Sequence, residues 1–236
     1  MSKICLINQP AGIGDILFLQ KFVDIKLSEG FEVVFPVNPN LVYLNDYIKK
    51  PNLKFVSIDE DFSHKGVYYS NKSIKEENFE FYPFNVADQH IAGSCLEAKY
   101  TLANQDFNDW QNHLVWERNT EKEDQLFYNH LNLKDDDKYI IVSNTWGTPP
   151  ATAKRDMVIN SPHRLINIQL LDGYTPFDWG KVLENATEIY MIDTSFNYIL
   201  EKLDLKAENL YLYSRFTPPN FSHIINLFKK NWIYQK

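Results

Sequence analysis

The sequence predicts an α/β protein of two Rossmann-like, doubly wound domains that face each other across a cleft. Two observations lead to this prediction. Apolar strand-like runs alternate with helical patterns over residues 3–58, and the same alternation restarts at residue 139. A polar, charged stretch over 117–138 separates them and is typical of a domain boundary. We therefore expect domains at 1–118 and 119–236.

The first domain is expected to begin with the order β-α-β-α-β. Its first helix has apolar residues at helical spacing, and Gly30 follows it as a typical helix terminator. The pattern weakens over 62–113, where only one helix stands out, at 96–102. In chain order we expect a strand at 3–9, a helix at 15–27, a strand at 31–37, a short helix at 40–49 and a strand at 53–58.

The second domain is expected to be another parallel sheet with helices between its strands. A helix at 121–130 precedes it, and a loop rich in Gly, Pro and Thr follows its first strand. A terminal helix at 222–232 is expected to pack back towards the first domain. The expected strands lie at 139–143, 166–171, 189–193 and 210–214, and the expected helices at 177–185 and 196–203.

Composition limits the class of protein. Hydrophobic residues make up 44% and aromatic residues 15% of the 236 residues, which is enough for packed cores. The net charge of −7 disfavours nucleic-acid backbones as partners, because these require a basic face. No apolar run approaches the roughly 18 residues of a membrane span, and the N-terminus lacks a signal-peptide pattern, so we expect a cytoplasmic protein.

A glycine turn between the first strand and the first helix is the strongest local motif. Gly12 and Gly14 allow a ligand close to the backbone, and Asp15 stands at the start of the helix. The third glycine of a dinucleotide site is replaced by Leu17, so NAD and FAD are disfavoured. Asp15 is a candidate general base, although an isolated Asp at such a position more often only caps the helix.

Two loops of the second domain carry groups that suit a diphosphate. The first loop offers hydroxyls and cations, and the second offers a polar triplet after a buried strand, where ligands of open α/β sheets bind. The same residues are also ordinary loop residues and helix caps. The candidate donor-binding residues are Thr145, Thr148, Lys154 and Arg155 in the first loop and Asp193, Thr194 and Ser195 in the second.

Taken together, these motifs resemble the heptosyltransferase-like branch of the GT-B glycosyltransferases. The run Gly14-Asp15-Ile16-Leu17 matches the family's first motif, and Asp193-Thr194 followed by Phe196 matches its second. The resemblance implies a catalytic base at Asp15 and a donor pocket around Asp193 and Thr194. The sequence departs from the family pattern at Gln20 and at the pair Asn197-Tyr198, so heptose itself is not carried over.

The leading hypothesis is a glycosyltransferase that moves a sugar from a nucleotide-sugar donor to an acceptor hydroxyl, with inversion and without a metal. No cofactor is expected, because the nucleotide sugar is the substrate. The acceptor is a glycan or another hydroxyl, and a modified DNA base stays open. One alternative is a metal-dependent GT-A-type transferase that uses Asp59 and Asp61, and another is a non-catalytic nucleotide- or glycan-binding module.

Overall fold

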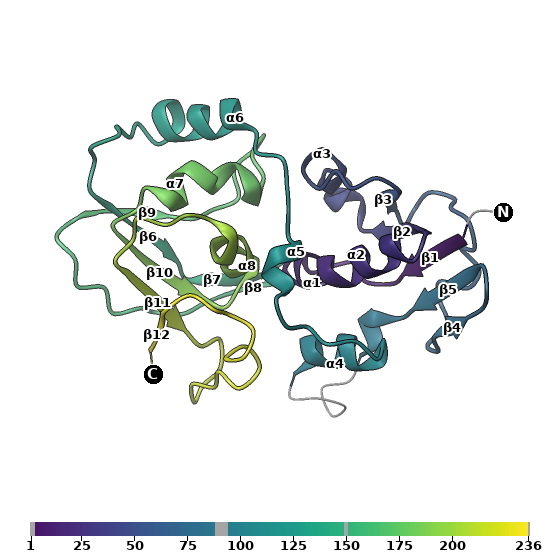
Figure 1. The fold of residues 1–236 in the computed structure, drawn as a ribbon. Helices are drawn as coiled ribbons and strands as arrows, with labels where there is room; N and C mark the ends of the chain where they lie inside the picture. The colour runs from purple at the N-terminus through teal and green to yellow at the C-terminus, as the bar shows by residue number, and fades with distance from the viewer. Residues whose placement is uncertain (1–2, 88–93, 149–150, 236) are drawn as a thin grey trace. The chain divides into compact units, whose positions relative to one another are not determined.

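The computed structural model describes residues 3–87, 94–148 and 151–235. The chain divides into two compact units, 1–117 and 118–236, and the boundary expected from the sequence falls after residue 118. Each unit contains its own five-stranded sheet, so there is no continuous sheet through the described chain. Figure 1 shows the two sheets with their helices. The prediction of two Rossmann-like parallel sheets is confirmed.

Unit 1 has the strand order β3-β2-β1-β5-β4, in which only the short edge strand β4 is antiparallel. Because β2 lies on one side of β1 and β5 on the other, the direction of winding reverses between β1 and β5. Such a reversal is the usual ligand position of an open α/β sheet. The strands are β1 Lys3–Ile7, β2 Phe31–Val37, β3 Leu53–Ser57, β4 Ile74–Lys75 and β5 Phe79–Tyr82.

The helices of unit 1 are shorter than the sequence pattern predicts. The expected first helix is divided at Leu19 into α1 and α2, and the expected helix at 40–49 is a 3-10 turn followed by α3. Helix α2 packs against β2 and α5. The helical segments are α1 Ile13–Phe18, α2 Gln20–Ser28, η1 Pro39–Leu41, α3 Leu44–Tyr47, η2 Phe84–Val86, α4 Cys95–Leu102 and α5 Trp110–His113.

Unit 2 has the fully parallel order β12-β11-β10-β6-β9, and its winding reverses between β6 and β10. Every residue of β6 is buried, as expected for a strand covered on both faces. A separate antiparallel hairpin consists of β7 and β8. The strands are β6 Tyr139–Ser143, β7 Thr145–Thr148, β8 Ala151–Lys154, β9 Arg164–Asn167, β10 Glu188–Ile192, β11 Asn209–Tyr213 and β12 Trp232–Gln235.

The helices of unit 2 include two that lie together on one side of the sheet, α6 and α7. The expected helix at 121–130 continues from α6 into a π-helical turn, and the one at 177–185 begins with a 3-10 turn. The segments are α6 Thr120–Asp124, η4 Gln125–His130, η5 Pro176–Trp179, α7 Gly180–Glu184 and α8 Ser195–Lys202. No helix of the described residues is both long and apolar enough to cross a membrane.

Two expectations for unit 2 are wrong. The segment after β6 is a hairpin rather than a loop, because its Thr and Trp residues favour strands. The expected terminal helix at 222–232 is also wrong, since residues 222–227 form turns and 232–235 form the edge strand β12. Glu201 accepts hydrogen bonds from the backbone N–H groups of Lys229 and Lys230, which a helix would need for itself.

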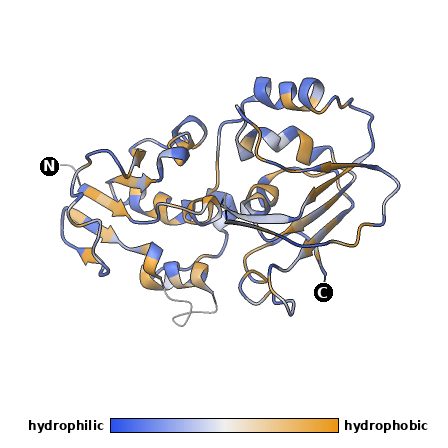
Figure 2. Ribbon diagram, turned by 180° about the vertical axis from the view of Figure 1, so that it is seen from behind, coloured by the Kyte–Doolittle hydropathy of each residue, from blue (hydrophilic) through white to orange (hydrophobic). Residues whose placement is uncertain are grey.

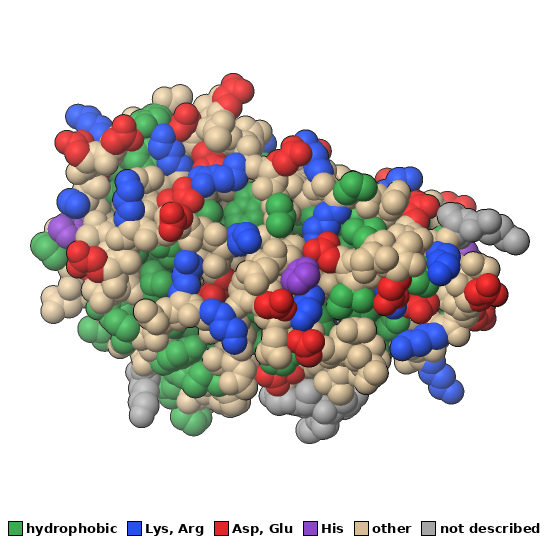
Figure 3. Space-filling view, in the orientation of Figure 1, with side chains coloured by type: hydrophobic (Ala, Val, Ile, Leu, Met, Phe, Trp, Pro, Cys, Tyr) green, Lys and Arg blue, Asp and Glu red, His purple; other side chains and the backbone are tan. Residues whose placement is uncertain are grey.

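The distribution of hydrophobic and charged residues agrees with two sheets of buried, apolar strands and a charged surface. Figure 2 shows the strands of both units in mostly hydrophobic colours. In unit 1 one apolar cluster contains Leu6, Val34 and Phe81. In unit 2 another contains Ile140, Val142 and Tyr190. On the face drawn in Figure 3, cationic and anionic side chains are interspersed, with no broad area of one sign.

Candidate functional site

In unit 1 the glycine turn lies where β1 ends, beside the point at which the winding reverses. Gly12 has φ +80° and precedes α1, and Gly14 is buried in the first turn of that helix. A Cβ atom on Gly12 would lie 2.5 Å from Asp15 Oδ2, so the carboxylate occupies the space that a larger residue would need. Only glycine therefore permits this position of Asp15.

Asp15 is held by a lysine that sequence reasoning missed. Lys99 Nζ lies 3.1 Å from Asp15 Oδ1 and also donates to Gln9 Oε1 at 2.7 Å and to the Phe84 carbonyl at 3.0 Å. The Asp15 side chain is 32% exposed, so the carboxylate is open to solvent while its partner is buried. Gln9 follows β1 and Phe84 follows β5, so these contacts span the reversal point of unit 1.

In unit 2 the carboxylate of Asp193 lies at the end of β10. It is buried, and its Oδ2 accepts from Arg215 Nη2 at 2.9 Å and from His223 Nε2 at 2.7 Å. Arg215 follows β11, the neighbouring strand, and remains partly exposed. Asp193 thus anchors one guanidinium and one imidazole at the carboxyl ends of adjacent strands.

Thr194 and Ser195 begin α8 directly after Asp193. The Thr194 N–H donates to Asn197 Oδ1 at 2.8 Å. The Thr194 hydroxyl and the Asn197 side-chain nitrogen are buried, and neither has a hydrogen-bond partner among the described residues. Ser195 is partly exposed as the first residue of the helix. The turn therefore combines a capping function with polar groups that its own fold does not satisfy.

The residues predicted from the loop after β6 divide into two groups. Arg155 Nη1 donates to the carbonyls of Ser214 at 2.7 Å and Phe216 at 2.9 Å, so it is close to the segment that carries Arg215. Lys154 and Thr145 are exposed partners in the hairpin. The side chain of Thr148 lies outside the described residues. The structure therefore brings Arg155 to the Asp193 region, and it records no such contact for Lys154 or Thr145.

Two neighbouring groups fix this part of unit 2. The hydroxyl of Tyr213 donates to the Val158 carbonyl at 2.9 Å, and burial raises the pKa of this tyrosine, so the donor stays protonated at neutral pH. The Ser214 hydroxyl donates to the Asn220 carbonyl and accepts from the Asn220 N–H. The segment that carries Arg215 and His223 is therefore tied to the end of β11.

Three functional candidates were not predicted: Lys99, Arg215 and His223. Arg215 could have been found by applying the strand-end rule to the fourth expected strand of the second domain, 210–214, as well as to the first and third. His223 stands in a segment expected to be helical, and Lys99 is a single lysine on a helix, so no local pattern marks either one.

The acidic turn considered as a metal site lies after β3. Asp59 and Asp61 are both exposed there. Over residues 3–87, 94–148 and 151–235, no three His, Cys, Asp or Glu side chains come together as ligands for a metal ion.

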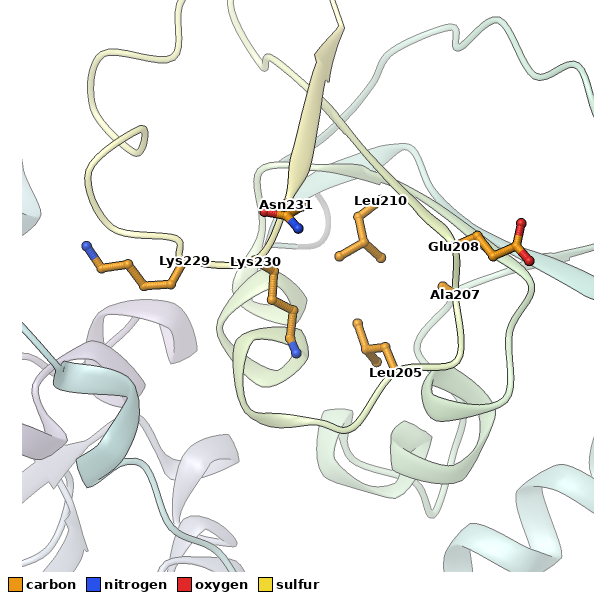
Figure 4. Close-up of a pocket in the computed structure, with 7 residues that line it drawn as sticks. All are labelled: Leu205, Ala207, Glu208, Leu210, Lys229, Lys230 and Asn231. Atoms are coloured by element: carbon orange, nitrogen blue, oxygen red, sulfur yellow. The ribbon is translucent and has the colours of Figure 1, made fainter.

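A shallow pocket of unit 2 lies away from these residues. It is formed by segments 205–210 and 229–231, as Figure 4 shows. These segments lead into β11 and β12, so the pocket is at the amino ends of strands whose carboxyl ends are near Arg215. Its position is opposite to the usual ligand edge of a parallel sheet.

Comparison with known proteins shows likeness at the level of structure. No protein-family model and no curated protein matches the sequence. The structure of a family 9 glycosyl transferase from Veillonella parvula matches with a TM-score of 0.58 at 10% identity, over 99% of this chain and 87% of that one. The ADP-heptose lipopolysaccharide heptosyltransferase II of E. coli matches with a TM-score of 0.54 at 11% identity, over 99% and 90%.

A third solved structure is the iron-containing dodecameric glycosyltransferase TibC from enterotoxigenic E. coli. It matches with a TM-score of 0.56 at 8% identity, and this chain spans 63% of the length of TibC. At sequence identities this low, the three matches show only that the folds are alike. The chain therefore has the GT-B-like fold of these glycosyltransferases, as the resemblance of its two motifs predicted.

Proposed function

We propose that this protein is a glycosyltransferase that moves a sugar from a nucleotide-sugar donor to an acceptor hydroxyl. The observation that supports the proposal best is the likeness of fold to a family 9 glycosyl transferase over 99% of the chain. The site chemistry agrees with it: a solvent-accessible carboxylate lies in the first turn of α1, after β1, in unit 1, and cations gather where β10 and β11 end in unit 2.

The proposed reaction is a single displacement that inverts the anomeric carbon and needs no metal. Asp15 takes the proton of the acceptor hydroxyl, and the acceptor oxygen forms a bond to the anomeric carbon. The bond between that carbon and the phosphate oxygen breaks, and the nucleoside diphosphate leaves with the electron pair.

Donor binding is assigned to unit 2. Arg215 and Arg155 carry positive charge at the strand ends, where charge-assisted hydrogen bonds to a diphosphate are strong. Asp193, Thr194 and Ser195 follow β10, and the unsatisfied Thr194 hydroxyl is a candidate contact. Lys154, Thr145 and Thr148 remain candidates from the hairpin. In unit 1, Asp15 would repel a diphosphate at close range.

The test is a turnover assay with purified protein and a panel of nucleotide sugars, headed by ADP-D-β-D-heptose, which is the ligand of a TibC structure. Release of the nucleoside diphosphate is measured. Asp15→Asn is expected to lower kcat by about 10²–10⁴-fold, the usual contribution of a positioned base. Asp24→Asn is the matched control, because Asp24 is 33% exposed and also pairs with a largely buried lysine, Lys50, at 2.6 Å.

Each other outcome has a defined meaning. Full turnover by Asp15→Asn would remove Asp15 from the role of base. A donor that binds without losing its sugar in the presence of hydroxyl acceptors would indicate a binding module. Turnover abolished by EDTA and restored by Mn²⁺ would favour the metal-dependent alternative at Asp59 and Asp61.

A further inference from the structure

The ammonium group of Lys99 is an unusual feature of unit 1. Lys99 lies on α4 and is only 4% exposed. Its Nζ atom donates hydrogen bonds to Gln9 Oε1 and the Phe84 carbonyl and forms an ion pair with Asp15 Oδ1. Asp15 is its one ion-pair partner among the described residues. A charge buried this deeply needs such partners, because an unpaired ammonium is costly away from water.

The surroundings hold this ammonium in place. The neighbouring residue Tyr100 donates its hydroxyl to the Phe18 carbonyl at the end of α1, at 2.7 Å. Gln9 is itself fixed, since its side-chain nitrogen donates to the Ala11 carbonyl at 2.6 Å. Helix α4 is therefore bound both to the glycine turn and to the helix that carries Asp15.

The two carboxylate oxygens of Asp15 have different environments. Oδ1 faces Lys99, whereas Oδ2 lies over the Cα atom of Gly12, where no Cβ is present. Because Lys99 is buried and its Nζ atom already contacts these three partners, it is not placed to bind a substrate itself. Its effect on a reaction must pass through the carboxylate.

We propose that Lys99 is a positioning residue, which holds Asp15 by Oδ1 so that Oδ2 receives the proton of the acceptor hydroxyl. The inference rests on the proposed function. When Oδ2 gains the proton, Lys99 keeps its own three hydrogens and its contacts with Gln9 and Phe84. The proton then passes from Asp15 to solvent, and the pair returns to its starting state.

The kinetic test uses Lys99→Met, which keeps the length of the side chain but removes its charge and hydrogens. We expect kcat to fall by about 10²-fold, the effect of displacing a reacting group by roughly 1 Å, while KM for the donor changes less than threefold. Lys99→Arg restores a cation and is expected to recover at least a tenth of the lost rate. A rise in KM for the donor with an unchanged kcat would overturn the proposal. So would the absence of any recovery of kcat in Lys99→Arg.

Lys26→Met is the matched control. Lys26 lies in the same unit, its side chain is 6% exposed, and it pairs with Glu29 at 2.8 Å and Glu80 at 2.7 Å, away from the glycine turn. Its loss disturbs a buried ion pair without touching Asp15. We expect its kcat to stay within twofold of wild type after correction for the folded fraction. Equal losses in the two lysine variants would overturn the proposal, because a general loss of fold would then explain both.

A second measurement does not depend on activity. Urea unfolding of Asp15→Asn, Lys99→Met and the double variant forms a double-mutant cycle. The shift of the urea midpoint caused by Lys99→Met is expected to be smaller in the Asp15→Asn background, because the partner charge is already absent. If the midpoint shifts of the two single variants add up to the shift of the double variant, Asp15 and Lys99 do not interact, and the proposal is overturned.

The outcomes separate this inference from the proposed function. If the wild-type protein transfers no sugar, the proposed function fails, and the role of Lys99 fails with it even when the cycle is non-additive. If Asp15→Asn is inactive but Lys99→Met keeps the wild-type kcat, only the role of Lys99 is overturned.

Discussion

Replacement of Gly12 by alanine should displace the carboxylate of Asp15, and so lower kcat, while the stability of the fold changes little. Gly12 has φ +80°, and a left-handed conformation costs an L-residue about 1–2 kcal/mol. Alanine also restricts the unfolded chain, which returns about 0.4–1 kcal/mol. The net loss of unfolding free energy from the backbone alone is therefore about 1 kcal/mol.

The new Cβ atom has a second effect, because it would lie 2.5 Å from Asp15 Oδ2. An ordinary contact needs a separation of 3.4–4 Å, so the carboxylate must move by about 1 Å. The end of a side chain can shift in this way without unfolding the unit. A displacement of that size costs about 10²-fold in rate when the group takes part in the reaction.

Gly30→Ala provides the control, because Gly30 has φ +84° and a Cβ atom added there would meet nothing within 4 Å. Urea unfolding of the two variants should give similar losses of about 1 kcal/mol. In the turnover assay, Gly12→Ala should lose about 10²-fold in kcat and Gly30→Ala should match wild type. Wild-type kcat in Gly12→Ala, or equal inactivity of both variants, would refute this reasoning.

Two further predictions concern unit 2. Glu201→Ala should lower the free energy of unfolding, measured in urea, by about 2–4 kcal/mol, because it leaves the N–H groups of Lys229 and Lys230 and the indole of Trp232 without their acceptor. The control Glu208→Ala, at an exposed position, should change it by less than about 0.5 kcal/mol. Equal effects of the two variants would contradict the conclusion that Glu201 holds the segment leading into β12. In calorimetry with ADP and UDP, Arg215→Ala or Arg155→Ala should weaken nucleotide binding about ten- to a hundredfold, whereas Asp15→Asn should leave it unchanged. A loss of nucleotide binding confined to Asp15→Asn would reverse the assignment of the donor to unit 2.

Most of the central strands could be predicted because a parallel strand buried on both faces is a continuous apolar run. Tyr139–Ser143 is such a run, and its bounds match the prediction. The stretch at 222–232 shows the limit of this approach. Its local pattern suits a helix, but the carboxylate of Glu201, about 30 residues earlier, holds the backbone groups that lead into a strand. Local periodicity carries no information on such a distant partner.

In the candidate site too, local sequence patterns predict some residues, and contacts between distant parts of the chain determine the others. Asp15 and Asp193 could be found because Asp193 ends a predicted strand and Asp15 begins the helix after one, and the topology of a parallel sheet concentrates ligand contacts at these ends. Lys99 could not, because its role depends on a helix that packs beside the glycine turn from a distant part of the chain. The hairpin at 145–154 was missed because glycine and prolines suggested a loop, although its threonines and tryptophan favour strands.

The contact between Gln9 and Lys99 joins positions 90 residues apart in the chain. Closing so long a segment costs more entropy than forming a local turn, and contacts of this kind slow the folding of a domain. The turn around Gly12 is local, whereas its carboxylate gains its cation only when this long segment has closed. Recovery of the Asp15–Lys99 pair therefore reports on the closure of that segment in unit 1. A partly folded chain would carry the glycine motif without the geometry that it needs.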